Sequence, residues 1–444
     1  MSFGKLLPGI VAPPPGPRSR LLSRGLAAEA PGVNTLSGGA PSLVWEEARG
    51  ANVRDVDGNV FIDLTSGFGV ASVGHRHPRV VAAVRRQAGR LLHGLGDVHA
   101  HPLRIELAAR LARLAPIDTP LDAALEDVPQ VFFAVSGAEA VEIALKTALA
   151  ATASPGVVAF EPSYHGLTLG ALAVTSRPEF RAPFAAHLHS HVRRLPFGCP
   201  PSLIAAELRR YRSHGSHGSQ GRHGVRTVIV EPIVGREGVL LPPAGWLAEV
   251  SSLCRAAGAL LIADEIFTGF GRTGSLFAVE AEGVRPDLLC CGKALGGGLP
   301  IAAVLGRRSL FRCWQTAGEA LHTSTFLANP LACAAALAVL DIFAGEGLSA
   351  RAAELGSALG RRLAGWPDRF PSLAAARGRG FLWGLEMQSR AAAARTVAAA
   401  LGRGLLVLAG GPQGRVVQLV PPLTITKSQL RAALDILEEV LATL

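Results

Sequence analysis

The stretch Leu288-Leu289-Cys290-Cys291-Gly292-Lys293 carries a short apolar run into a lysine. Two other apolar runs lead in the same way into acids, at Asp264-Glu265 and at Glu231. Runs of this length are typical of buried strands, and alternation with helical stretches is the pattern of parallel α/β units. The strand-like runs are 131–135, 157–160, 227–230, 259–263 and 288–291.

The positions of the charged residues predict a site at one edge of this sheet. Ligands of parallel α/β sheets bind beyond the carboxyl ends of the strands. Asp264 and Glu231 follow strand-like runs directly and Lys293 follows one after Gly292, so we expect the three side chains to lie close together.

Lys293 is the candidate nucleophile of that site. The chain has 4 lysines against 40 arginines, so arginine is its usual cation. An amine in a poorly hydrated site can lose its proton and attack a carbonyl, whereas a guanidinium stays protonated. A lysine that only begins a helix is the alternative.

The segment Ser136-Gly137-Ala138-Glu139 follows the first strand-like run and begins a helix. The backbone N–H groups of Gly137 and Ala138 would offer a phosphate seat at the helix N-terminus. A capping box between Ser136 and Glu139 explains the same residues without a ligand.

Three further features indicate a flat, charged ligand. Asp264 could pair with a protonated ring nitrogen, or it could cap a helix. Tyr164, beside His165 and Gly166, could stack on a ring or belong to the core. The glycine-rich loop 269–274 is interpreted as shaped against a ligand.

Together these features describe a pyridoxal phosphate site, and from about Val44 onwards the chain resembles a class III (ω-) aminotransferase of PLP fold type I. Five motifs in family order carry the resemblance: Gly74-His-Arg-His-Pro78, Ser136-Gly-Ala-Glu-Ala-Val-Glu142, Asp264-Glu-Ile-Phe-Thr-Gly-Phe-Gly-Arg-Thr-Gly274, Gly292-Lys-Ala-Leu-Gly-Gly-Gly298 and His322-Thr-Ser-Thr-Phe-Leu-Ala-Asn-Pro330.

The resemblance implies a role for each matching residue. Lys293 would form the internal aldimine with pyridoxal 5'-phosphate and later move the substrate Cα proton. Asp264 would pair with the pyridine nitrogen, and Tyr164 would stack on the ring. The phosphate would be held by Gly137, Ala138 and the partner subunit's Thr325, because family active sites form at a homodimer interface.

The chain departs from the family pattern where substrates bind. Gln418 stands where many members have a carboxylate-clamping arginine, so the family's gating glutamate, matched by Glu231, lacks its partner. Arg415 and Arg236 are the candidates to replace it. The chain departs from the family at two further positions. Leu149 stands in place of an arginine, and Phe267 stands in place of a glutamine.

These departures shape the expected reaction, which is a ping-pong transfer of an amino group from an amine or ω-amino acid to a 2-oxo acid. A PLP-dependent amino-acid racemase or epimerase on the same scaffold is the alternative. We expect a large domain with a mostly parallel central sheet flanked by helices, and a small α+β domain built from both termini. The expected boundaries are 1–40 (extended N-terminal arm), 41–95 (N-terminal part of the small domain), 96–335 (large domain) and 336–444 (C-terminal part of the small domain).

Composition narrows the class of protein further. The net charge is +10, but there is no Lys/Arg block and there are only 2 tyrosines, which speaks against a nucleic-acid partner. No apolar run reaches the roughly 18 residues of a membrane helix. The six cysteines have neither C-x-x-C nor metal-site spacing, so we expect reduced thiols, a cytoplasmic location and no metal. The first 28 residues are basic and lack acids, as in a transit peptide, but Pro13-Pro14-Pro15 disfavours the required helix.

Overall fold

The computed structural model describes residues 3–33, 42–117, 128–210 and 224–444. The sequence over 215–224 is rich in Gly, Ser and His, a low-complexity pattern that predicts a loop, and this segment lies outside the described residues except for Gly224. Part of the expected arm 1–40 lies outside them as well.

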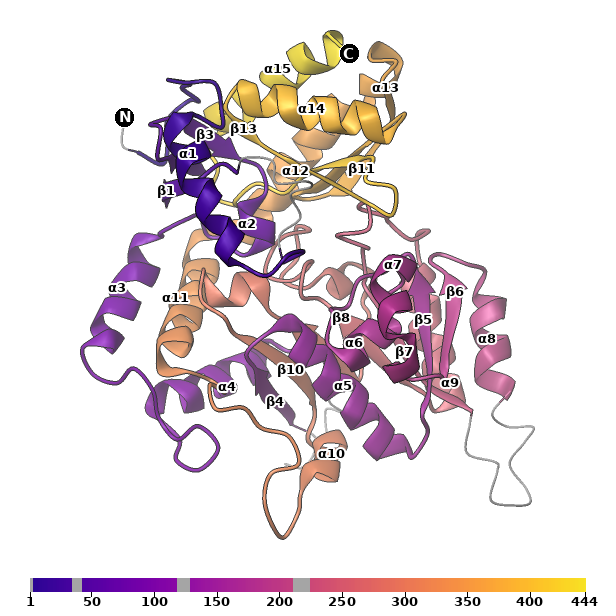
Figure 1. Ribbon diagram of the computed structural model, residues 1–444. Coiled ribbons are helices and arrows are strands. Elements are labelled where there is room, and N and C mark those ends of the chain that lie inside the picture. The colour runs from indigo at the N-terminus through magenta and orange to yellow at the C-terminus, as the bar shows by residue number, and fades with distance from the viewer. Residues whose placement is uncertain (1–2, 34–41, 118–127, 211–223) are drawn as a thin grey trace.

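A seven-stranded sheet in the order β4-β10-β9-β8-β7-β5-β6 organises the large domain (Figure 1). Strand β10 runs antiparallel to both of its neighbours, and the other pairs are parallel. The five runs expected as strands are all confirmed, and two strands, β6 and β10, were not predicted. The bounds are β4 (Pro129–Ala134), β5 (Gly156–Glu161), β6 (Val192–Pro196), β7 (Val225–Val230), β8 (Leu260–Asp264), β9 (Leu288–Cys291) and β10 (Ala302–Arg307).

Both faces of this sheet are buried, because its strands send alternate side chains into two cores. In β8, Leu261 and Ala263 enter one core, while Leu260 and Ile262 enter the other. This explains why the strands are continuously apolar. Helices α9 (Trp246–Ala257) and α5 (Gly137–Thr152) contribute to these two cores, respectively.

Two smaller sheets form the small domain, and segments from both ends of the chain meet there, indigo and yellow in Figure 1. Strand β13 pairs in parallel with β3, and the Gln429 side chain donates to Asn52 Oδ1 at 2.8 Å. The sheets are β1 (Trp45–Arg49), β2 (Asn52–Asp55), β3 (Val60–Asp63) with β13 (Leu405–Leu406), and β11 (Leu373–Arg379), β12 (Leu382–Met387), β15 (Val416–Leu419) with β14 (Leu408–Gly410).

The N-terminal stretch expected as an extended arm contains the helix α1 (Pro17–Leu22) and the 3-10 helix η1 (Ser23–Ala28). It is tied to the hairpin of β2 and β3, because the N–H of Leu6 donates to Asn52 Oδ1 at 3.0 Å and the N–H of Val11 donates to Asn59 Oδ1 at 2.7 Å.

Helix α11 (Pro330–Glu346) lies between the domains, with Ala336 in the large-domain core and Val339 in the small-domain core. Within the described residues, no single helix is long and apolar enough to cross a membrane; α11 and the segment Leu348–Arg369 meet that test only as a pair bent by 63°. The other long helices are α3 (Pro78–Ala88), α4 (Pro102–Leu114), α8 (Pro201–Arg210), α12 (Leu348–Ala364), α14 (Arg390–Gly402) and α15 (Lys427–Ala442).

Candidate active site

Three adjacent strands bring the expected charged groups together. Asp264 ends β8, Glu231 follows β7 and Lys293 follows β9, and β8 lies between β7 and β9 in the sheet. The charges of Asp264 and Glu231 both act on the Lys293 amine. The predicted convergence at the carboxyl edge of the sheet is therefore what the structure shows.

Lys293 has a strained backbone and a perturbed amine. Its φ of 41° lies in the left-handed region, which costs a non-glycine residue about 1–3 kcal/mol and is enriched at functional sites. Burial lowers the pKa of the amine below its ordinary value, the charge of Arg236 acts in the same direction, and Asp264 opposes them. A lowered pKa favours the neutral amine that can attack a carbonyl.

Asp264 is held by a histidine to which the sequence motifs assigned no role. His165 Nδ1 lies 2.7 Å from Asp264 Oδ2, and the two residues are only 2% and 4% exposed. Burial by itself would lower the pKa of His165, but the hydrogen bond and charge of Asp264, with the charge of Glu231, raise it above its ordinary value. Asp264 Oδ1 also accepts from the N–H of Ile266 at 3.1 Å, and no regular helix follows.

Glu231 is committed to backbone contacts. Its carboxylate accepts from the N–H groups of Tyr164 at 2.8 Å and Gly235 at 3.0 Å. Burial, its dominant influence, raises its pKa to about 7. Glu231 thus connects the backbone at Tyr164 to the turn after β7. Among the residues described here, no arginine forms an ion pair with Glu231.

The start of α5 presents the backbone N–H donors that the sequence predicted for a phosphate. Ser136 Oγ accepts from the N–H of Glu139 at 3.2 Å, but Glu139 Oε2 accepts from the N–H of Val135 and not from that of Ser136, so only one half of the expected capping box forms. Gly137 and Ala138 occupy the first turn of α5, where N–H groups have no partner within the helix.

Phe267 covers the Lys293 amine, whose Nζ lies 4.5 Å from the centre of the ring. The ring fits between two glycines. A Cβ on Gly69 would lie 2.8 Å from Phe267 Cε2, and a Cβ on Gly235 would lie 2.0 Å from Cδ1.

The two arginines considered for carboxylate binding have different surroundings. Arg415 pairs with Glu386, which also binds Arg377. The Arg236 guanidinium lies 4.2 Å from the centre of the Tyr164 ring. Gln418 donates its side-chain N–H to the Arg236 carbonyl at 3.2 Å.

Thr325 is exposed on the surface of the single chain, in the segment before α11. The neighbouring segment 91–98 packs beside it, because His93 and Phe326 have ring centres 5.3 Å apart and Asn329 donates to the Leu92 carbonyl at 3.0 Å.

The glycine-rich loop 269–274 faces the small domain. Arg272, 1% exposed, donates to the carbonyl of Pro421 and to Ser72 Oγ at 2.8 Å. A Cβ on Gly274 would lie 3.1 Å from that of Ala353. Protein packing therefore accounts for these glycines, which the sequence suggested were shaped by a ligand.

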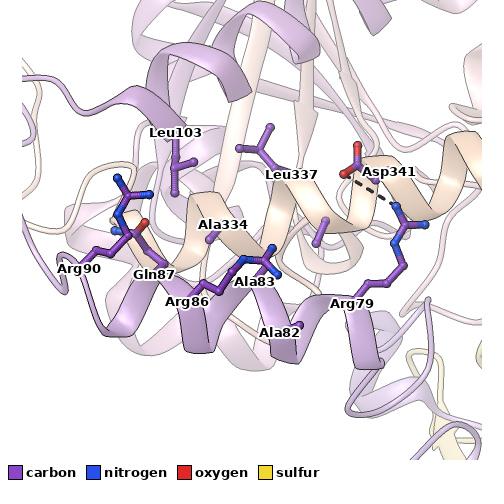
Figure 2. Close-up of a pocket in the computed structure, with 11 residues that line it drawn as sticks. Arg79, Ala82, Ala83, Arg86, Gln87, Arg90, Leu103, Ala334, Leu337 and Asp341 are labelled. Carbon is purple, nitrogen blue, oxygen red and sulfur yellow. Dashed lines mark ion pairs between the residues drawn. The ribbon is translucent and has the colours of Figure 1, made fainter.

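A groove of about 560 Å³ lies away from this site, between α3 and α11 (Figure 2). Arg79, Arg86 and Arg90 line it, and Arg79 faces Asp341 at 3.9 Å. None of the residues at the strand ends contributes to it. Within the described residues, no three His, Cys, Asp or Glu side chains are grouped as metal ligands.

The residues at the strand ends fit pyridoxal phosphate. Lys293 supplies an amine with a lowered pKa, Asp264 a buried carboxylate with acceptor capacity left over, and the start of α5 free N–H donors for a phosphate. His165 Nε2 is buried without a hydrogen-bond partner within the described residues. With such a cofactor bound, the set would supply a nucleophile, a charge partner for the ring nitrogen and donors for the phosphate.

Comparison with known proteins gives consistent results. The family model described as Aminotransferase class-III matches residues 36–441. An acetylornithine aminotransferase of Methanosarcina mazei is 37% identical over 401 residues, covering 90% of this chain and 92% of its own length.

Solved structures show the same likeness. The ornithine aminotransferase of Toxoplasma gondii superposes with a TM-score of 0.83 at 30% identity, over 95% of this chain and 94% of its own. An amine transaminase from an uncultivated Pseudomonas species, solved in its PLP-bound form, has a TM-score of 0.80 at 28% identity, over 93% of this chain and 98% of its own.

Proposed function

Because this chain belongs to the class-III aminotransferase family, and is therefore a PLP-dependent enzyme that moves amino groups between amines and 2-oxo acids, we propose that the residues at the strand ends of β7, β8 and β9 form its active site. The observation that carries the proposal is the meeting of Lys293, Asp264 and the start of α5 at one sheet edge. The family resemblance and the α/β fold expected from the sequence are confirmed.

Each residue has a distinct task in this proposal. Lys293 Nζ would hold the cofactor and, once displaced by substrate, would take the proton from substrate Cα and deliver it to the cofactor. Asp264, oriented by His165, keeps the cofactor's ring nitrogen positively charged. Gly137 and Ala138 bind the phosphate through their N–H groups. When bound, pyridoxal phosphate withdraws electrons from substrate Cα.

Substrate assignments follow from the departures in sequence. The absence of an arginine at Gln418 supports an amine or ω-amino acid as donor. Arg415 is the weaker of the two candidate carboxylate contacts, because Glu386 already pairs with it. Glu231 serves as a scaffold for Tyr164, whose ring remains the proposed stacking partner.

We propose a homodimer that buries the apolar surface around Thr325. Leu92, Leu95, Val98 and Phe326 are 58%, 60%, 67% and 61% exposed, and contacts between the two segments make them one region. An apolar region of this kind marks an interaction site. The six cysteines are free thiols, which supports the cytoplasmic location.

The test is a half-reaction followed by the absorption of the purified holoenzyme. A transaminase converts bound pyridoxal phosphate to pyridoxamine phosphate with an amine donor alone, and a 2-oxo acid restores the first spectrum. Exchange of the substrate Cα proton without any such conversion would favour the racemase or epimerase alternative. The names of the relatives, which are aminotransferases, support transamination.

A further inference from the structure

The charge of the Arg236 guanidinium acts on the Lys293 amine and on the Glu237 carboxylate. Within the described residues, no Asp or Glu oxygen forms an ion pair with this guanidinium. The guanidinium lies over two aromatic rings, 4.2 Å from the centre of Tyr164 and 5.4 Å from that of Phe180. A stacked guanidinium keeps its N–H edge free for hydrogen bonds.

The neighbouring Arg177 differs from Arg236, because acceptors occupy its side-chain N–H groups. Arg177 donates Nε to Glu237 Oε2 at 2.7 Å and Nη2 to the Gly411 carbonyl at 2.8 Å, so its donors are occupied. Glu237 is the acid that faces both arginines, and its charge attracts that of Arg236. Its hydrogen bond, however, goes to Arg177.

The backbone that carries Arg236 is fixed in place. The Arg236 carbonyl accepts from the side chain of Gln418 at 3.2 Å and from the N–H of Gly411 at 3.1 Å. The preceding Gly235 donates to Glu231 and lies against the Phe267 ring that covers the Lys293 amine. Because this backbone is held rigidly, little of its conformational entropy is lost when the side chain binds a ligand.

We propose that Arg236 is the carboxylate-binding residue of this enzyme and that Gln418 positions it. The inference rests on the proposed function, because it takes Lys293 as the reacting group. An acidic substrate would present its carboxylate to the free edge of the guanidinium, which matches a carboxylate bidentately. The proposed ligands are 2-oxo acids and amino acids, both of which present a carboxylate.

A non-reactive dicarboxylate tests the proposal. Glutarate has neither an amine nor a keto group, so its binding to the holoenzyme can be measured by calorimetry without turnover. We expect Arg236→Gln to weaken glutarate binding by about 10- to 100-fold, the range for hydrogen bonds to charged groups, and Arg236→Lys to weaken it less. Arg193→Gln, a change on the half-exposed strand β6, is the matched control and should leave binding unchanged.

Butylamine, a donor without a carboxylate, separates this inference from the proposed function. Its conversion of the bound cofactor should persist in Arg236→Gln, because butylamine has no carboxylate contact to lose, while the KM for 2-oxo acids rises in the variant. Unchanged glutarate affinity in Arg236→Gln, or no glutarate binding by the native enzyme, would overturn the inference while amine conversion persists. Failure of every amine to convert the native cofactor would overturn the proposed function itself.

Discussion

His165 Nδ1 lies 2.7 Å from Asp264 Oδ2, and both side chains are almost completely buried. Of the described residues, His165 is the side chain that fixes Asp264 Oδ2, while the backbone of Ile266 fixes Oδ1. The histidine thus fixes the orientation of the carboxylate that we propose to pair with the cofactor's ring nitrogen. The pair connects β8 to the Tyr164 segment, which Glu231 holds from β7.

Two replacements of His165 should distinguish what its hydrogen bond contributes to stability from what its volume contributes. His165→Leu leaves a buried carboxylate with one partner fewer, so we expect a loss of about 1–3 kcal/mol in the free energy of unfolding. His165→Asn keeps an N–H donor and should lose less. Denaturant unfolding of both variants measures this, and equal stability of the two would contradict a role for the hydrogen bond.

Asp264→Asn removes the charge and keeps the shape. The cofactor should remain bound, because Lys293 and the start of α5 are unchanged, but removal of the substrate Cα proton should slow by roughly 10²–10³-fold. Single-turnover absorption kinetics with a Cα-deuterated donor report this step. Normal kinetics would mean that the ring nitrogen has another partner.

Lys293→Ala should abolish turnover without unfolding the protein. The lost group is a reacting amine, so we expect kcat to fall by at least about 10²–10⁴-fold, as for the loss of a proton-transfer group. Circular dichroism and sedimentation should match those of the native enzyme. Lys427→Ala is the control, because the Lys427 side chain is 70% exposed and pairs only weakly with Glu354 at 3.6 Å. Near-native activity of the Lys293 variant would remove this lysine from the mechanism.

Gly235→Ala should overpack the space that Phe267 fills. The added Cβ would lie 2.0 Å from Phe267 Cδ1, and overpacking of this kind costs about 1–3 kcal/mol. The double variant Gly235→Ala with Phe267→Ala should recover part of that loss, because the ring that clashes is gone. A double-mutant cycle of unfolding free energies tests the contact, and strictly additive effects would refute it.

The buried carboxyl of Glu265 should make stability depend on pH. Burial raises its pKa from 4.5 to about 7 in the folded protein, against the hydrogen bonds from Thr268 and the N–H of Val279. Between these pH values the unfolded chain has lost its proton and the folded chain has kept it, so stability falls as pH rises.

Glu265→Gln removes that titration, and its amide oxygen can accept from the N–H of Val279 while its N–H donates to Thr268 Oγ1. The unfolding midpoint of the variant should therefore rise relative to that of the native enzyme as pH goes from about 4.5 to about 7, and the difference should stay constant above that range. Parallel pH profiles would show that Glu265 titrates normally.

Local patterns in the sequence predicted the central sheet well where strands are buried on both faces. Strands β7, β8 and β9 are continuous apolar runs for this reason. Strand β6 was missed because it lies at the sheet edge and carries two arginines in a half-exposed segment. Strand β10 was missed because it is rich in alanine and glycine, which have little strand preference.

The sequence by itself determined the parallel α/β order, the family and the convergence of Lys293, Asp264 and Glu231, because strand direction alone brings strand ends to one edge. Only the tertiary structure decided which partner each group has. His165 meets Asp264 across 99 positions of the chain, and Gln418 meets the Arg236 carbonyl across 182. Such contacts depend on how helices and loops pack over the sheet, and no local pattern of residue types encodes that packing.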